Sequence, residues 1–78
     1  MKVTLKQLAV FRAVVLSGSI SNARRSLGLA QPTISQQLAK LEEILGTQLI
    51  HRGQSHGVHM TQAGEFWLRT AEDILKRM

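Results

Sequence analysis

The sequence predicts a mainly α fold: a winged helix-turn-helix of three helices and a two-stranded β-hairpin wing, followed by a C-terminal linker helix. Three successive stretches of helical character each end at a glycine. Two short apolar runs then flank a link that contains glycine and serine, which is typical of a hairpin. At 78 residues the chain is one folded unit, near the size at which a single core is sufficient.

The first helix is expected from Thr4 to Leu16, with Thr4 as its N-cap and Gly18 as its stop. Apolar residues recur through it at helical spacing, namely Leu5, Leu8, Phe11, Val14 and Val15. This stripe predicts one face packed against a core.

The second helix is short: Ser19 or Ser21 can cap its start, it runs to Leu27, and Gly28 breaks it. Pro32 then suits the first turn of a third helix, because the N–H that proline lacks is not needed there. A short helix, a tight glycine-containing turn and a helix with polar outward residues at its start together describe a helix-turn-helix.

The third helix is expected over residues 31–45, with Gly46 as a left-handed C-cap. At about 100° per residue, its inward face carries Ile34, Leu38, Leu41 and Leu45. Its outward face carries Pro32, Thr33, Gln36, Ala39, Lys40 and Glu43. The N-terminal half of that outward face has no acidic group and short hydrogen-bonding side chains, which suits close approach to another molecule.

The wing is expected from residues 48–52 and 57–60, which flank the link 53–56. Two strands this short are not stable alone, so the wing must lean on the helices.

The last helix is expected over residues 61–78, capped by Thr61. It has two overlapping apolar stripes, and a face this broad exceeds what a core of this size covers. We therefore expect part of it to pair with a second chain. The candidate dimerisation residues are Trp67, Leu68, Ala71, Ile74, Leu75 and Met78.

Composition narrows the classes of function. The chain has no cysteine, which excludes disulfides and thiolate metal sites within it. Polar and basic residues interrupt the apolar positions of the first 20 residues, so no signal peptide or membrane span is expected and the default location is the cytoplasm. The net charge is +5, and residues 1–30 hold five basic residues and no acid. This asymmetry indicates a polyanionic partner.

These residues, in this order, resemble the N-terminal DNA-binding domain of LysR-type transcriptional regulators. The match runs from Leu5 to about Ile74, and it is densest at Gly18-Ser19-Ile20, Ala23, Leu27, residues 30–38, Leu41-Glu42, Leu45-Gly46, Leu49, Arg52 and residues 61–64. The resemblance implies a winged helix-turn-helix over residues 1–60 and a dimerising linker helix over residues 61–78. It also implies an effector domain, absent from this chain, through which a small-molecule inducer would act.

The chain departs from the family pattern in three places. The pair of alanines usual in the second helix is Ala23-Arg24, so the Arg24 head must turn outward. The serine or threonine that often caps the third helix is Ala30, so Gln31 or water must satisfy the first N–H groups. The phenylalanine usual in the first wing strand is Ile50. None of these changes removes a residue that the family uses to read DNA.

The third helix offers side chains that suit base edges. Gln36 can bond adenine N6 and N7 together, and Thr33 or the ring of Pro32 can touch a thymine methyl, each good contact being worth about 1–3 kcal/mol. By resemblance, Gln31 and Ser35 contact a base edge or the backbone. The alternatives are a solvated surface and, for a helical serine, a bond to a preceding carbonyl.

Phosphate contacts are expected beside these residues. Lys40 can reach a phosphate, with an ion pair to Glu43 as the rival interpretation. Arg52 opens the wing, where an arginine commonly enters the minor groove. Gln54 and Ser55, with His56, can touch sugar and phosphate beside it, or can remain in solvent.

We expect the partner to be double-stranded DNA with an interrupted palindromic operator, bound by a homodimer that pairs through the C-terminal helix. We expect that a full-length protein could also assemble as a tetramer. No membrane contact and no cofactor are expected.

Other functions are less well supported. His51, His56 and His59 could bind zinc, but no acid or cysteine lies in the wing, so no metal site is expected. No nucleophile and base come together, so no enzymatic activity is expected. The winged helix of molybdate-responsive regulators has a similar turn and wing, but residues 30–35 disfavour it. A winged helix used only for protein interaction or dimerisation would show no duplex binding at any salt concentration.

Overall fold

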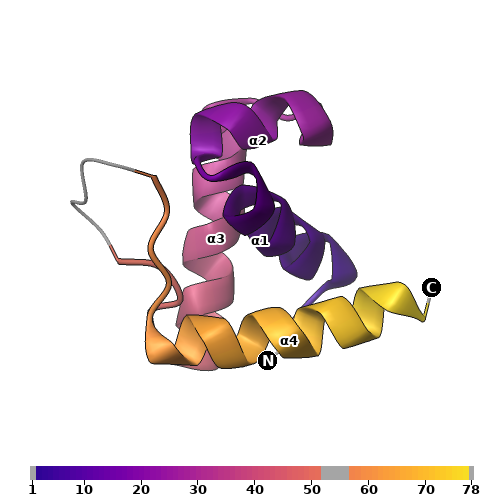
Figure 1. Ribbon diagram of the computed structural model, residues 1–78, viewed down its shortest axis with the longest axis vertical. Helices are drawn as coiled ribbons and strands as arrows, with labels where there is room; N and C mark the ends of the chain where they lie inside the picture. Colours follow the sequence, from indigo (N-terminus) through magenta and orange to yellow (C-terminus); the bar gives the residue numbers. More distant parts are fainter. Residues whose placement is uncertain (1, 52–56, 78) are drawn as a thin grey trace.

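The computed structural model describes residues 2–51 and 57–77. These ranges contain the helices α1 (Leu5–Ser17), α2 (Ile20–Leu27), α3 (Gln31–Leu45) and α4 (Gln62–Lys76). α1 packs against each of the other three, α2 lies across the N-terminal end of α3, and α4 runs across the opposite end of the molecule (Figure 1). The mainly α fold is confirmed, although α4 ends two residues before the predicted Met78, which lies outside the described residues.

Side chains at the helix starts explain where α1 and α2 begin. The hydroxyl of Thr4 accepts a hydrogen bond from the N–H of Gln7 at 3.1 Å, and the Gln7 side chain accepts one from the N–H of Thr4 at 2.9 Å. This reciprocal capping box satisfies two otherwise unpaired donors. Ser19, and not Ser21, caps α2, because its hydroxyl accepts from the N–H of Asn22 at 3.0 Å.

α3 begins without a side-chain cap. Ala30 has extended backbone but no side-chain group that can accept a hydrogen bond from the first turn, and Pro32 removes one of the donors there. The helix ends at Gly46, whose φ of 70° is left-handed, as its sequence position predicts. The predicted range of residues 31–45 is confirmed.

The core is built around the inward face of α3. Ile34, Leu38 and Leu41 are fully buried, and the fourth predicted inward residue, Leu45, is half-buried against them. Other elements contribute the remaining buried apolar residues: Leu8, Val10, Phe11, Val14, Ala23, Leu49, Ile50 and Ala71. The core therefore holds α3 by one face only and leaves the other face outside.

The two wing segments pair antiparallel at one point. Ile50 bridges Met60, the N–H of His51 donates to the His59 carbonyl at 2.8 Å, and the N–H of Thr61 donates to the Leu49 carbonyl at 3.0 Å. No longer strand occurs in the described ranges, so the predicted hairpin is present there as a single bridge. Its expected link, residues 53–56, lies outside those ranges.

Glu42 ties the base of the wing to α3. One oxygen of its carboxylate accepts the N–H of Leu49 at 2.8 Å and the N–H of Ile50 at 3.3 Å. Thr61 ties the same segment to the start of α4, because its hydroxyl donates to the Gln48 carbonyl at 2.6 Å and also accepts from the N–H of Gly64 at 2.9 Å. The segment that contains Leu49 and Ile50 is therefore held to α3 by Glu42 and to the start of α4 by Thr61.

Glu42→Ala is expected to lower the free energy of unfolding by about 1–3 kcal/mol, because it leaves two partly buried backbone donors without an acceptor. Glu43→Ala, at the exposed neighbouring position, is the control and should change stability by less than about 0.5 kcal/mol. Urea denaturation of both variants measures the difference. Equal losses would show that the Glu42 carboxylate does not hold the wing.

Candidate nucleic-acid interface

The outward face of α3 is exposed along its N-terminal half. Gln31, Pro32, Ser35 and Gln36 are all exposed, and Thr33 is half-buried. The structure thus brings together on one helix the side chains that the sequence singles out for base contacts. They can reach a partner without disturbing the core, because the buried residues occupy the opposite side.

The electrostatics of this face favour an anion. The first acidic residue of the chain is Glu42, so neither α1, α2 nor the first turns of α3 carry a carboxylate. The first N–H groups of α3 also lack a side-chain cap, and the helix dipole makes that end positive. Such an end suits a phosphate group.

Lys40 stands one turn beyond Gln36 and is exposed. Its expected rival ion pair with Glu43 is not formed: within the described part of the chain the ion pair joins Arg12 and Glu72. Ser35 likewise forms no bond to a preceding carbonyl within the described residues, whereas the helical hydroxyls of Ser26 and Thr70 do. Both groups are available to an outside partner.

The wing residues Arg52, Gln54 and Ser55 lie outside the described residues, as does His56. His51 and His59 are exposed. The described ranges hold no cluster of three or more His, Cys, Asp or Glu side chains that could hold a metal ion.

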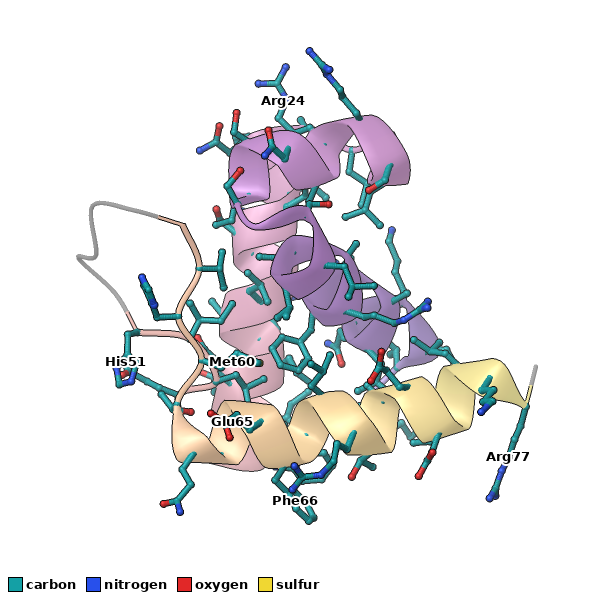
Figure 2. The ribbon with its side chains drawn as sticks, viewed as in Figure 1. Arg24, His51, Met60, Glu65, Phe66 and Arg77 are labelled. Carbon is teal, nitrogen blue, oxygen red and sulfur yellow. The ribbon has the colours of Figure 1, made fainter. Side chains whose placement is uncertain are left out.

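Arg24 takes the outward direction expected of it. It is exposed on α2, and Figure 2 shows its side chain directed away from the helices. Its neighbour Ala23 is fully buried, so the close approach of α2 to the core uses only the first position of the usual alanine pair.

The predicted dimerisation residues differ in their exposure on the single chain. Ala71 is wholly buried in the core of the single chain, and its place in the dimerisation set stays a prediction. Trp67, Leu68 and Leu75 are half-buried against the core, whereas Ile74 is 39% exposed. Met78 lies outside the described residues.

Phe66, which the sequence interpretation left out, is 54% exposed and points away from α1 and α3 (Figure 2). Its ring meets that of Trp67 edge to face with centroids 5.4 Å apart. A signal that could have found it is its spacing from Ile74, because eight residues at 3.6 per turn place the two side chains about 80° apart around α4.

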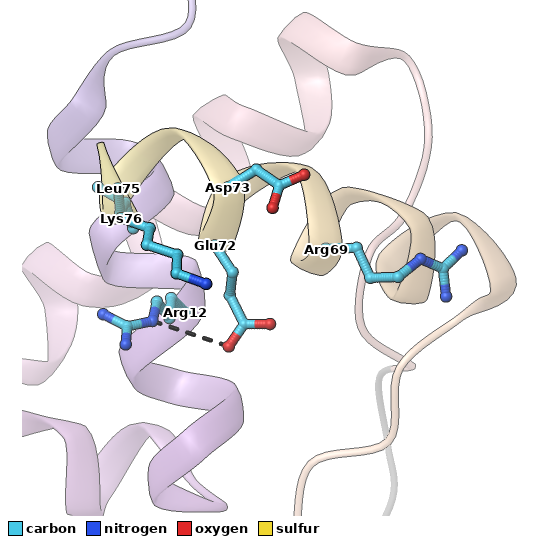
Figure 3. Close-up of a pocket in the computed structure, with 6 residues that line it drawn as sticks. All are labelled: Arg12, Arg69, Glu72, Asp73, Leu75 and Lys76. Atoms are coloured by element: carbon cyan, nitrogen blue, oxygen red, sulfur yellow. Dashed lines mark ion pairs between the residues drawn. The ribbon is translucent and has the colours of Figure 1, made fainter. Parts of the chain in front are cut away.

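An open groove of about 570 Å³ lies where α4 meets α1 (Figure 3). It is lined by Arg12, Arg69, Glu72, Asp73, Leu75 and Lys76. Basic and acidic groups alternate there, and the Arg12 Nε and Glu72 Oε2 atoms are 4.0 Å apart with both side chains nearly half exposed. This mixed charge does not favour binding of a polyanion. By contrast, α2 and the first turns of α3 carry no carboxylate. The helices of the described ranges also lack the combined length and apolar character needed to cross a membrane.

Solved structures of other proteins share this fold. The chain superposes on the protein in "Crystal Structure of BenM_DBD/catB site 1 DNA Complex" with a TM-score of 0.91 and 40% identity, over 96% of this chain and 83% of that one. It superposes on "Crystal structure of CbnR_DBD-DNA complex" with a TM-score of 0.89 and 35% identity, over 95% of this chain and 84% of that one. The predicted fold class, including its relation to winged helix-turn-helix domains, is therefore confirmed.

Curated relatives point the same way. The chain is 38% identical over 73 residues to the HTH-type transcriptional regulator TdcA of Escherichia coli (strain K12), covering 94% of this chain but 23% of that protein. It is 41% identical over 71 residues to the HTH-type transcriptional regulator BudR of Klebsiella aerogenes, covering 91% of this chain and 49% of that protein. The model of the family described as "Bacterial regulatory helix-turn-helix protein, lysR family" matches residues 5–65. Because this match extends from the start of α1 into α4, the chain belongs to the LysR family of bacterial regulatory helix-turn-helix proteins.

Proposed function

We propose that this chain binds double-stranded DNA in a sequence-specific manner, as the DNA-binding part of a bacterial transcriptional regulator in the cytoplasm. The observation that carries the proposal is the outward face of α3, which is exposed, uncharged in its first turns and held by a buried inward face. An α-helix of this kind fits the major groove of B-DNA. The relatives are regulators, and two of the superposed structures are described as DNA complexes, which supports the same function here.

In this proposal α3 reads bases and the surrounding groups hold the backbone. The amide of Gln36 bonds adenine N6 and N7, and Thr33 or Pro32 contacts a thymine methyl. Gln31 and Ser35 contact a base edge or the backbone, and the Lys40 ammonium neutralises a phosphate. The uncapped start of α3 offers its N–H groups to another phosphate.

The wing and α4 complete the proposed assembly. Arg52 would enter the minor groove, with Gln54 and Ser55 beside it on the sugar-phosphate backbone. The exposed apolar residues Phe66 and Ile74 would join α4 to a second copy, which would present a second α3 to the other half of an interrupted palindrome. The chain spans 23% of the length of TdcA, and sensing of an inducer and tetramer formation are proposed only for a longer regulator that contains an effector domain.

Gln36→Ala is expected to relax base preference at one position in each half-site, with a loss of about 1–3 kcal/mol per half-site on the preferred duplex. Affinity for unrelated duplexes should remain unchanged, because they do not offer the matched adenine edge. Gln62→Ala is the matched control, since Gln62 is an exposed glutamine in the first turn of α4. Competition binding on duplexes that vary one base at a time measures the preference. An unchanged base profile in Gln36→Ala would remove Gln36 from the reading set.

A further inference from the structure

Two arginines stand together at the C-terminal end of α2. Arg24 and Arg25 both lie in its last turn and both are exposed. Neither forms an ion pair within the described part of the chain, and α2 itself contains no acidic residue. The molecule therefore presents two adjacent cations with no carboxylate beside them.

The position of this pair relative to α3 is fixed by a short connection. α2 ends at Leu27 and α3 begins at Gln31, so residues 28–30 join the last turn of one helix to the first turn of the other. The two helices also pack against each other. The arginines thus flank the N-terminal end of α3, whereas the wing is tied to Glu42 near the opposite end of that helix.

A contribution to the stability of α2 does not explain why two arginines stand at its C-terminal end. A cation near a helix C-terminus gains only a small stabilisation from the helix dipole at an exposed site, and two adjacent like charges repel each other. At position 24 the family resemblance places an alanine, so the arginine is a feature of this chain rather than a requirement of the fold. A planar guanidinium can form two parallel hydrogen bonds to a phosphate. An interaction with the helix dipole needs only a positive charge and makes no use of this geometry.

We propose that Arg24 and Arg25 form a second phosphate-binding element, which grips the DNA backbone beside the groove that α3 occupies. This inference rests on the proposed DNA binding and adds to it a contact that is independent of base sequence. This contact would extend the bound stretch of DNA backbone past the N-terminal end of α3. The Glu42 contacts to the wing lie near the opposite end of that helix.

The test compares three double variants in fluorescence anisotropy titrations. Arg24→Ala/Arg25→Ala removes the pair, and Arg24→Lys/Arg25→Lys keeps the charge but not the guanidinium fork. Lys2→Ala/Lys6→Ala removes the same net charge at the start of α1, which lies at the α4 end of the molecule (Figure 1). The probes are a mixed-sequence duplex and a duplex selected by the parent chain, each titrated over a range of NaCl concentrations.

The alanine pair should weaken binding to both duplexes alike, by at least about tenfold at low salt, since charged hydrogen bonds are lost. For each bound copy, the slope of log affinity against log salt should become shallower by about 1.8, because about 0.9 is expected for each of the two phosphate contacts. Two backbone positions in each half-site should also lose interference when their phosphates are ethylated. The lysine pair should keep the slope and lose part of the affinity, and the Lys2/Lys6 control should lose less on both measures.

Failure of the inference is distinguishable from failure of the proposed function. If the parent chain binds duplex and the arginine variant keeps its affinity, slope and interference pattern, the phosphate role is overturned and DNA binding stands. The same conclusion follows if the Lys2/Lys6 control shows an equal loss, or if only the melting temperature changes in the arginine variant. If the parent binds no duplex, both proposals fall.

Discussion

Gly64→Ala is expected to lower the free energy of unfolding by about 3 kcal/mol or more, because there is no space for a Cβ at this position. The added atom would overlap the Leu49 carbonyl oxygen, and it would lie 3.0 Å from the Leu49 carbonyl carbon and 3.2 Å from the Met60 Cβ. The opposing backbone cannot move away freely. The Leu49 carbonyl accepts the N–H of Thr61, and the Leu49 N–H is held by Glu42.

Gly46→Ala is a control that separates the cost of a steric clash from the cost of an unfavourable backbone conformation. A Cβ at Gly46 would meet nothing within 4 Å, but its φ of +70° is left-handed. That substitution should therefore cost only about 1–2 kcal/mol, the usual penalty for a side chain in that conformation. Chemical denaturation of both variants decides the question. If Gly64→Ala is no more destabilising than Gly46→Ala, α4 does not press on the wing as closely as the structure indicates.

Phe66→Glu is expected to abolish pairing through α4 and to weaken binding to a two-half-site duplex by about 10²–10⁴-fold. The reason is that a charged side chain would face apolar surface in the partner, so each copy would bind its half-site alone. Binding to a duplex with a single half-site should stay unchanged. Sedimentation equilibrium measures the oligomeric state, and titration of the two duplexes measures the loss of joint binding.

Leu16→Glu is the matched control for this prediction. Leu16 on α1 is 62% exposed and Phe66 is 54% exposed, so each substitution replaces an accessible apolar side chain by the same acid. Only the change on α4 should alter the oligomeric state. A dimer that survives Phe66→Glu, or one that is lost equally in Leu16→Glu, would contradict pairing through the exposed side of α4.

Local chemistry made the helices predictable. Thr4, Gly18, Gly46 and Thr61 act through their own hydrogen bonds or backbone angles, and the structure uses all four at the helix ends. The inward stripe of α3 was equally accessible from periodicity, because one helix can bury only one face in a core of this size. The candidate site follows directly from this stripe, because the site lies on the opposite, outward face of α3.

Contacts between elements were not predictable in the same way. The Glu42 carboxylate reaches backbone donors seven and eight residues away, and no periodic pattern reports such a tie. The exposure of Phe66 and the burial of Ala71 depend on how α4 crosses α1, which the two overlapping stripes of α4 left open. The short wing runs also contained too few residues to show how far their pairing extends.

Selection of bound duplexes from a random pool tests the central proposal most directly, because it requires only the chain and DNA. The proposal predicts enrichment of an interrupted palindrome whose half-sites share an A·T pair that Gln36→Ala no longer selects. Binding to the enriched duplex should fall steeply as salt rises. A pool that remains random after repeated selection, with no retention of duplex even at low salt, would contradict DNA recognition by this chain.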